Sequence, residues 1–170
     1  MECNGNGLCF NYDTSSPMCP SMKITADRRH SPKGRAGLVR EWLRQLSEKG
    51  IDPMKLEAEL MSQSPTVKQI IDRFRNTFGS GKSDYDFSHE VMEAMNGCLA
   101  CKACASQCPI KVDVPSFRSR FLNIYHSRYQ RPAKDYLVSN IESMLPLMAK
   151  APSVVNGVLK QSWVQSLTAS

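Results

Sequence analysis

Four cysteines stand close together in the second half of the chain. Cys98, Cys101, Cys104 and Cys108 fall within eleven residues, and Pro109 follows the last of them. The spacing C-x-x-C-x-x-C-x-x-x-C-P is typical of cysteines that hold a [4Fe–4S] cluster. Three thiols at short, equal steps can surround one small inorganic cube. This run therefore predicts iron–sulfur chemistry.

Three further cysteines lie near the start of the chain and repeat that pattern incompletely. Cys3 and Cys9 are separated by five residues, and Asn6 stands at the midpoint, where a full motif has a cysteine. Cys19 precedes Pro20, just as Cys108 precedes a proline. The chain therefore contains two cysteine groups about eighty residues apart, each ending in Cys-Pro.

These two groups predict a crossed arrangement of ligands. In proteins with two such clusters, the cysteine of each Cys-Pro pair binds the cluster of the other group. A first cluster would then be held by Cys19, Cys98, Cys101 and Cys104. A second would be held by Cys3, Cys9 and Cys108, with Asn6 at the missing position. The competing assignment places all of Cys98, Cys101, Cys104 and Cys108 on one cluster, although the proline after Cys108 redirects the chain and favours the crossed version.

The second, incomplete site leaves several possibilities open. Three thiolates could hold a [3Fe–4S] cluster, or a [4Fe–4S] cluster whose fourth iron is bound by Asn6, Asp13 or water. Cys3 and Cys9 could also be free thiols. Because a ligand so close to a free terminus would fray, we expect Met1-Glu2 to be an artificial start and the chain to be part of a longer protein.

A different class of function is a structural zinc site in a module that binds nucleic acid or protein. Zinc sites use paired Cys-x-x-Cys units, whereas this run has three consecutive ligands and a Cys-Pro. The densest basic stretch, from Arg28 to Arg35, has no interleaved aromatic residues for stacking on bases. We therefore rank zinc below iron–sulfur and expect no nucleic acid. His30, His89 and His126 are more simply surface, capping or core histidines than ligands.

The composition is that of a globular protein kept in a reducing compartment. Hydrophobic residues make up 41% and charged residues 22%, and no apolar run approaches the length of a membrane helix. Seven cysteines without a secretion signal favour reduced thiols in the cytoplasm. The net charge of +6 fits a solvated basic surface that also offsets the negative charge of clusters.

Helical periodicity and proline–glycine punctuation predict an all-α fold. Apolar residues recur at helical spacing behind several start signals, and these stripes are expected to form the core. The expected helices begin at Ser31-Pro32, Asp52-Pro53, Ser64-Pro65, Ser88, Pro115, Pro132 and Pro152. Gly79–Asp86 is expected to be a loop, and Pro146 to break or kink its helix. The cysteines would lie in loops between helices or on a short turn such as Lys102–Gln107.

Several stretches together resemble one protein family. They are Cys3–Cys9, Met18–Ser21, His30–Ala36 and the run from Cys98 to Pro109. Over roughly residues 1–130 the chain is similar to the iron–sulfur portion of large bacterial proteins in which an FAD-linked oxidase portion comes first. These are of the D-lactate, glycolate and D-2-hydroxyglutarate dehydrogenase type. Asn6 departs from the full double motif.

This resemblance implies an α-helical ferredoxin-like domain over residues 1–130 and a helical extension over 131–170. It also implies electron transfer from the FAD of a D-2-hydroxy-acid dehydrogenase to a quinone or another acceptor. The partners would be the FAD-binding portion of the same protein and that acceptor, in the cytoplasm or at the periphery of the inner membrane. We find no substrate site in this chain itself, so any enzymatic activity would belong to the longer oxidoreductase.

Overall fold

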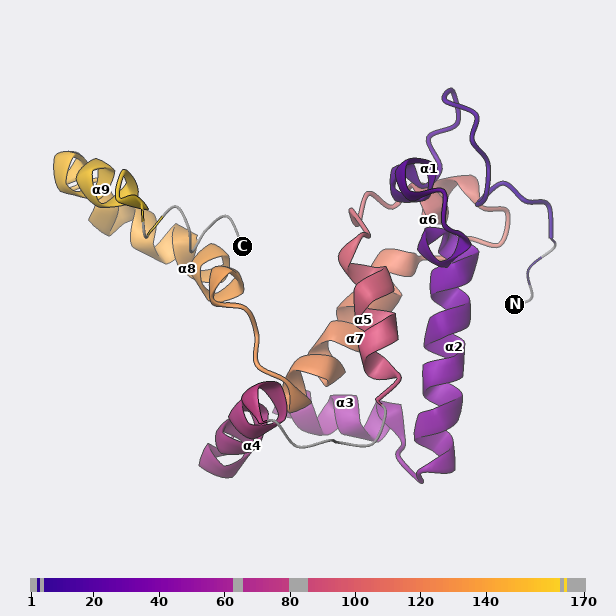
Figure 1. Ribbon diagram of the computed structural model, residues 1–170, viewed down its shortest axis with the longest axis horizontal. Coiled ribbons are helices and arrows are strands. Elements are labelled where there is room, and N and C mark those ends of the chain that lie inside the picture. Colours follow the sequence, from indigo (N-terminus) through magenta and orange to yellow (C-terminus); the bar gives the residue numbers. More distant parts are fainter. Residues whose placement is uncertain (1–2, 4, 63–65, 80–85, 163, 165–170) are drawn as a thin grey trace. The chain divides into compact units, whose positions relative to one another are not determined.

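The computed structural model describes residues 3, 5–62, 66–79, 86–162 and 164, and every regular element in these residues is a helix (Figure 1). The expectation of an all-α fold is therefore confirmed. The chain divides into two compact units, Met1–Tyr129 and Gln130–Ser170. Among the helices of the described residues, none combines the length and apolar character needed to cross a membrane.

Three helices form the centre of the first unit. Helices α2 (Pro32–Glu48), α5 (Ser88–Asn96) and α7 (Val114–Arg128) pack against one another. Their shared core is closed by an edge-on contact between Trp42 and Phe121, whose ring centres are 5.0 Å apart. The sulfur-bearing Cys104 belongs to the same buried cluster. The cysteine run is thus joined directly to the main core.

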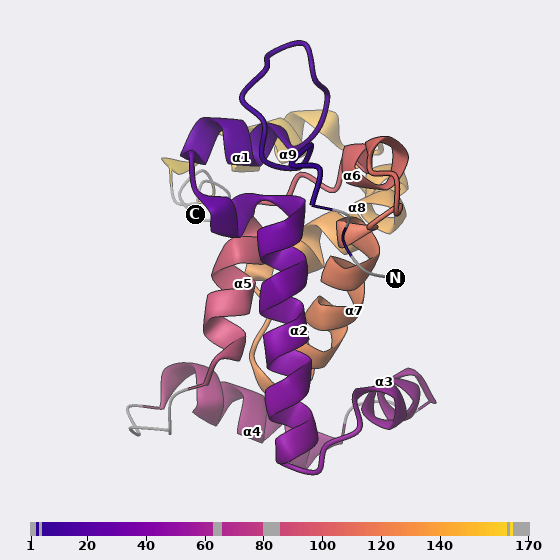
Figure 2. The ribbon, with the colours of Figure 1, turned by 90° about the vertical axis from the view of Figure 1, so that its right-hand side faces the viewer.

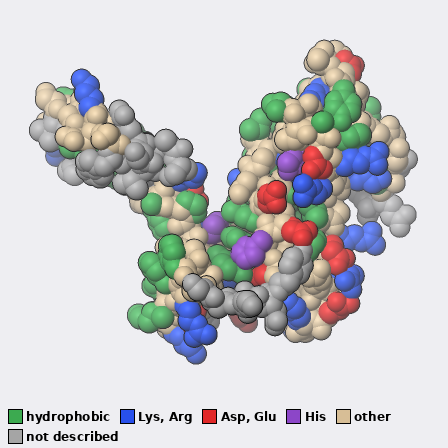
Figure 3. All heavy atoms as spheres, in the orientation of Figure 1, with side chains coloured by type: hydrophobic (Ala, Val, Ile, Leu, Met, Phe, Trp, Pro, Cys, Tyr) green, Lys and Arg blue, Asp and Glu red, His purple; other side chains and the backbone are tan. Residues whose placement is uncertain are grey.

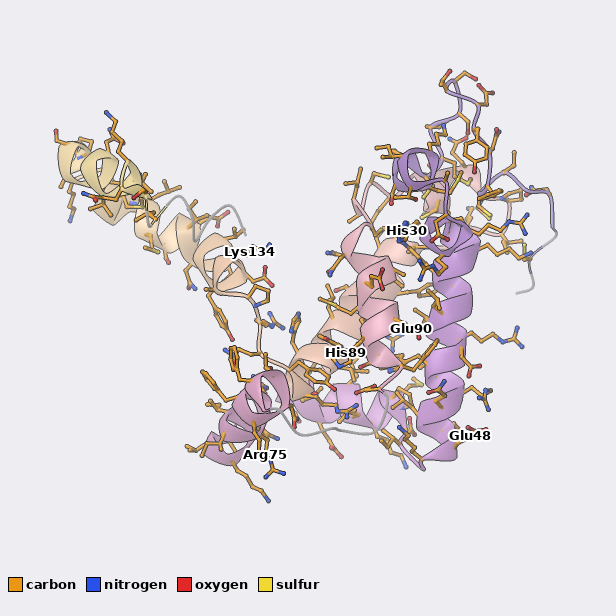
Figure 4. All side chains as sticks on the ribbon, viewed as in Figure 1. His30, Glu48, Arg75, His89, Glu90 and Lys134 are labelled. Atoms are coloured by element: carbon orange, nitrogen blue, oxygen red, sulfur yellow. The ribbon has the colours of Figure 1, made fainter. Side chains whose placement is uncertain are left out.

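The remaining elements of this unit gather at its two ends. Helix α1 (Pro20–Thr25), the 3₁₀ turn η1 (Arg28–His30) and α6 (Ala103–Gln107) lie at one end, and α3 (Pro53–Ser62) and α4 (Val67–Phe78) lie at the other (Figures 1 and 2). Figure 4 labels His30 at the first end of α2 and Glu48 at the opposite end. The helical bundle therefore separates the cysteine-bearing end from α3 and α4.

Side-chain caps fix where the central helices begin. Ser31 Oγ accepts a hydrogen bond from the Gly34 N–H at 3.1 Å and starts α2, as its sequence position predicts. The expectation that Ser88 caps α5 is wrong, because Ser88 is the first helical residue. The Asp86 carboxylate accepts from the Ser88 N–H at 3.0 Å instead. A carboxylate suits this place, since the start of a helix carries unpaired N–H groups.

Helix α4 differs most from its sequence expectation. Its apolar stripe was expected in the core, yet all five of its members are exposed: Val67, Ile70, Ile71, Phe74 and Phe78. The helix contacts α7 through its polar side, where Arg73 Nε and Asn76 Nδ2 each donate to a carbonyl at the end of α7, both at 3.1 Å. Figure 3 shows green apolar side chains beside blue basic ones in this region. The expected start at Ser64-Pro65 lies outside the described residues.

The described residues of the second unit form the helices α8 (Ala133–Met148) and α9 (Pro152–Leu159). Helix α8 runs on through Pro146, which was expected to break or kink it. Proline has no backbone N–H, but this proline stands close to the end of the helix. The helix therefore loses one backbone hydrogen bond, near its last turn. The described side chains of both helices are exposed or half-buried. The described members of their apolar stripes therefore do not form the core that the sequence predicts.

Candidate iron–sulfur centre

Four cysteines from two distant segments line one small cavity, called here the Cys19 cavity. Its volume is about 20 Å³, and it is bordered by the thiols of Cys19, Cys98, Cys101 and Cys104. Prolines and apolar side chains complete the wall, together with Arg35 and Lys102. The cysteine that precedes Pro20 thus lies with the first three cysteines of the later run.

The loop that carries the later cysteines is tightly curled. It leaves α5 through a hydrogen bond from the Cys98 N–H to the Met95 carbonyl at 3.0 Å. Ala100 and Lys102 then adopt left-handed backbone angles, with φ of 52° and 59°. Such angles are unfavourable for residues with a side chain and are found where the surroundings impose them. They turn the chain on either side of Cys101, so that three thiols face one space.

Cys19, at the start of α1, also has a left-handed backbone conformation. Its own φ is 49°, and its side chain is buried. The thiol donates a hydrogen bond to the His30 carbonyl at 3.2 Å and accepts one from Arg35 Nη1 at 3.6 Å. The sulfur is therefore fixed by η1 and α2 rather than by its own helix.

The burial of Cys104 affects its protonation. Burial raises the pKa of the Cys104 thiol, and the neighbouring sulfurs of Cys98 and Cys101 raise it further. The backbone N–H groups of Val114 and Ala105 near the same sulfur oppose this shift in pKa. Because a metal binds the thiolate, iron would displace this proton, and the two N–H groups would then face a charged sulfur.

The other three cysteines line a second and larger cavity, called here the Cys108 cavity. It measures about 380 Å³ and is bordered by Cys3, Cys9, Cys108 and Asn6. Gly5 and Gly7 turn the N-terminal loop with left-handed φ values of 70° and 74°, where glycine is favoured. The Gly5 N–H also donates to Cys3 Sγ at 3.3 Å. This cavity thus combines three sulfurs with an amide side chain.

The charges around both cavities have one sign. Arg35 and Lys102 border the Cys19 cavity, and Arg28 and Lys33 border the Cys108 cavity. Among the described residues that line them, neither cavity has an aspartate or a glutamate. A cluster with four thiolate ligands is an anion, so the surroundings fit its charge.

The donor set at the Cys19 cavity consists of four thiols. Their number and type match the four cysteine ligands of a [4Fe–4S] cluster. The described residues contain no group of three or more Cys, His, Asp or Glu side chains placed to hold one metal ion.

Two residues of this centre have roles that the sequence expectations missed. Arg35 was read only as part of a basic stretch, but its side chain is buried against Cys19. His30 was expected to be a surface or capping residue, yet its Nδ1 is buried and has no hydrogen-bond partner among the described residues. In the sequence, both residues stand out only because they lie in the His30–Ala36 stretch. The 3₁₀ turn η1, which contains His30, is too short to show an apolar period.

Comparison with known proteins adds a family and several relatives. The model of a family described as "4Fe-4S dicluster domain" matches residues 1–112. A D-2-hydroxyglutarate dehydrogenase of Pantoea ananatis is 64% identical over 168 residues, and that of Escherichia coli K12 is 62% identical over 168 residues. A D-2-hydroxyglutarate dehydrogenase of Pseudomonas putida is 52% identical over 169 residues.

These alignments cover nearly all of this chain but a small part of each relative. Each alignment includes 99% of this chain but only 16% of the relative. The chain therefore spans about a sixth of the length of these curated relatives. No solved structure matches the chain.

Proposed function

Since this chain belongs to the 4Fe–4S dicluster domain family, we propose that it is an electron-transfer domain with two iron–sulfur sites. The first site would use the four thiols of the Cys19 cavity. The second would use the three thiols of the Cys108 cavity, with Asn6 at the fourth position. The observation that carries this proposal is the common cavity of Cys19 and the first three cysteines of the later run.

When bound, iron–sulfur clusters take up and release single electrons. The chain's own groups would hold and shield them. Thiolates anchor the iron, the N–H groups of Val114 and Ala105 face the Cys104 sulfur, and the prolines and apolar side chains of the cavity wall limit water. The basic side chains lower the free energy of added negative charge, which favours reduction.

We further propose that the source of the electrons is a flavin in another part of a longer protein. The named relatives are D-2-hydroxyglutarate dehydrogenases and are about six times as long as this chain. Oxidation of a 2-hydroxy acid to a 2-oxo acid releases two electrons and two protons. FAD accepts such a pair, and single-electron centres would pass the electrons on to a quinone or another acceptor.

The test is anaerobic reconstitution of the chain, followed by analysis of iron, sulfide and zinc. We expect iron and sulfide in equal amounts, roughly four of each per cubic cluster. Electron paramagnetic resonance of the dithionite-reduced protein should then show paramagnetic centres. Stoichiometric zinc without sulfide would overturn the electron-transfer function and favour a structural metal module.

The source of electrons needs the full-length protein. D-2-hydroxyglutarate added without oxygen should give the same resonance signals as dithionite. If only another D-2-hydroxy acid, such as D-lactate, produces them, the substrate part of the proposal fails and the electron-transfer function stands.

A further inference from the structure

Arg35 is a buried cation without a carboxylate partner. Its side chain is among the largest fully buried ones, with a relative exposure of 2% for the residue. In the described part of the chain, no Asp or Glu forms an ion pair with it, although five other such pairs occur. A buried charge strongly destabilises a fold unless it is paired and hydrogen-bonded. Arg35 must therefore have another source of compensating negative charge.

Its three hydrogen bonds identify that source. Nε donates to the Ala94 carbonyl at 2.8 Å, and Nη2 donates to Ser21 Oγ at 2.9 Å. Nη1 donates to Cys19 Sγ at 3.6 Å. The sulfur is the only one of these acceptors that can carry a full negative charge, which it gains when its proton is replaced by iron.

A glycine beside the guanidinium leaves room for it. A Cβ at Gly97 would lie 3.4 Å from Arg35 Nη2 and 3.3 Å from Ser21 Oγ. A Cβ at Gly34 would lie 2.0 Å from the Arg28 carbonyl oxygen, so glycine allows η1 to lie against the first turn of α2, the helix that carries Arg35.

The same side chain joins both segments of the Cys19 cavity. Ala94 lies in the last turn of α5, where carbonyl groups lack helical partners. Cys98 follows that helix closely, whereas Cys19 and Ser21 belong to the start of α1. Arg35 therefore stands between the two chain segments that contribute thiols.

We propose that Arg35 is a positioning residue that offsets the charge of the cluster at the Cys19 cavity and raises its reduction potential. The inference rests on the proposed function, because it requires a cluster held by Cys19. One-electron reduction by dithionite adds a negative charge beside the guanidinium. A fixed positive charge at this distance stabilises the reduced form more than the oxidised form.

The experiment compares Arg35→Gln with Arg35→Lys in reconstituted protein, by redox titration followed with electron paramagnetic resonance. Glutamine keeps hydrogen-bond donors but removes the charge, so the potential should become more negative. Lysine keeps the charge, so its potential should stay closer to that of the wild type. Arg40→Gln removes an exposed charge from the same helix and should keep the wild-type potential.

The outcomes separate this inference from the function on which it rests. Wild-type protein without sulfide overturns the function, whereas a cluster signal unaffected by Cys19→Ser overturns the inference, because the inference requires a cluster held by Cys19. An Arg35→Gln protein that holds its cluster at the wild-type potential overturns the inference alone. If Arg35→Gln fails to load, full loading of Arg35→Lys supports the need for charge, whereas loss of loading in both variants assigns Arg35 a purely geometric role and overturns the inference.

Discussion

At the scale of single residues, Cys19 is the side chain that distinguishes the proposed crossed ligand arrangement from one in which the later run binds a cluster alone. It reaches its cavity from a segment about eighty residues away from the other three thiols. Cys108, which is close to those thiols in sequence, lines the other cavity. The backbone joins Cys104 and Cys108 by a hydrogen bond from the Cys108 N–H to the Cys104 carbonyl at 3.2 Å.

The assignment of cysteines to the two proposed clusters can be tested by replacing one thiol in each cavity. Cys19→Ser should reduce the iron content and change the resonance signal of the cluster at the Cys19 cavity, because a hydroxyl is a poorer ligand for iron. Cys108→Ser should leave that signal intact and affect only a second centre. Iron analysis and spectra of both reconstituted variants make the comparison. Loss of the first signal in Cys108→Ser, with Cys19→Ser unchanged, would mean that the later run binds one cluster alone.

Asp86 is a half-buried carboxyl group just before α5, at the end of the first unit that lies away from the cysteines. Burial alone raises the pKa of this carboxyl, but hydrogen bonds from Tyr129 and Ser88 and the charge of Arg128 outweigh it, so the pKa lies below its usual range. The Tyr129 hydroxyl donates to Asp86 at 2.7 Å. Burial and this carboxylate raise the pKa of Tyr129 to about 12.

These shifts predict how stability depends on pH. A lowered pKa means that Asp86 stabilises the fold above about pH 4 and that this contribution is lost as the pH falls through the lowered value. Tyr129 contributes fully below about pH 10, and its contribution is lost as the pH rises through about 12. Asp86→Ala should lower the free energy of unfolding near neutral pH by about 1–3 kcal/mol and flatten its acid dependence. Urea unfolding of the full chain at several pH values measures this.

Asp72 offers the matched control, since it is an exposed aspartate on α4. Asp72→Ala should keep both the stability and its acid dependence. If the free energy of unfolding of Asp86→Ala falls at acid pH as steeply as that of the wild type, other carboxyl groups cause this acid dependence.

At the scale of elements, one glycine lets η1 lie against the start of α2 beside the Cys108 cavity. Gly34→Ala forces a Cβ towards the Arg28 carbonyl oxygen, 2.0 Å away in the present geometry, so η1 or α2 must move. We expect a loss of about 1–3 kcal/mol in the free energy of unfolding and a lower content of bound iron. Thermal unfolding and iron analysis provide the measurements.

Gly37 provides an internal comparison on the same helix. A Cβ there meets nothing within 4 Å, and the residue is exposed. Gly37→Ala should raise helix stability by about 0.5–1 kcal/mol and leave iron binding unchanged. Equal effects of the two substitutions would show that the close approach at Gly34 does not constrain the site.

The elements also show what can be predicted from sequence. Proline and glycine punctuation locates α2, α3 and α9, because those residues impose backbone angles locally. By contrast, α1 and η1 are too short to show an apolar period. Which face of α4 is covered depends on two carbonyl groups at the end of α7, and no local pattern encodes a partner so distant in sequence.

The candidate site shows the same contrast between local features, which can be predicted, and contacts between distant segments, which cannot. Cysteine types and spacing predict which residues can hold a cluster, since ligand chemistry is a local property. The buried position of Arg35 could not be predicted, because its partners Ala94, Ser21 and Cys19 lie on other segments of the chain. A basic residue within a basic stretch is usually solvated, and only the packing around Cys19 and Ala94 shows otherwise.

At the scale of the whole molecule, the two units differ in what could stabilise them. The first has a main core that includes Cys104 and a smaller buried cluster around Cys19, and all seven cysteines belong to this unit. The second has described side chains that are exposed or half-buried and no cysteine. Clusters that bind only the folded state would therefore stabilise the first unit, by an amount set by their affinity.

This difference predicts where hydrogen exchange slows when the chain is reconstituted. Amides of α2, α5 and α7 should exchange more slowly in the loaded protein than in the chelator-treated protein, because opening of the core then requires loss of the cluster. Amides of α8 and α9 should exchange rapidly in both states, since few buried contacts oppose their opening. Exchange followed by mass spectrometry of peptides resolves each helix. Equal slowing in α8 and α9 would show that cluster binding is coupled to the second unit, and unchanged exchange in α2 would mean that the cysteine sites do not contribute to the stability of the core.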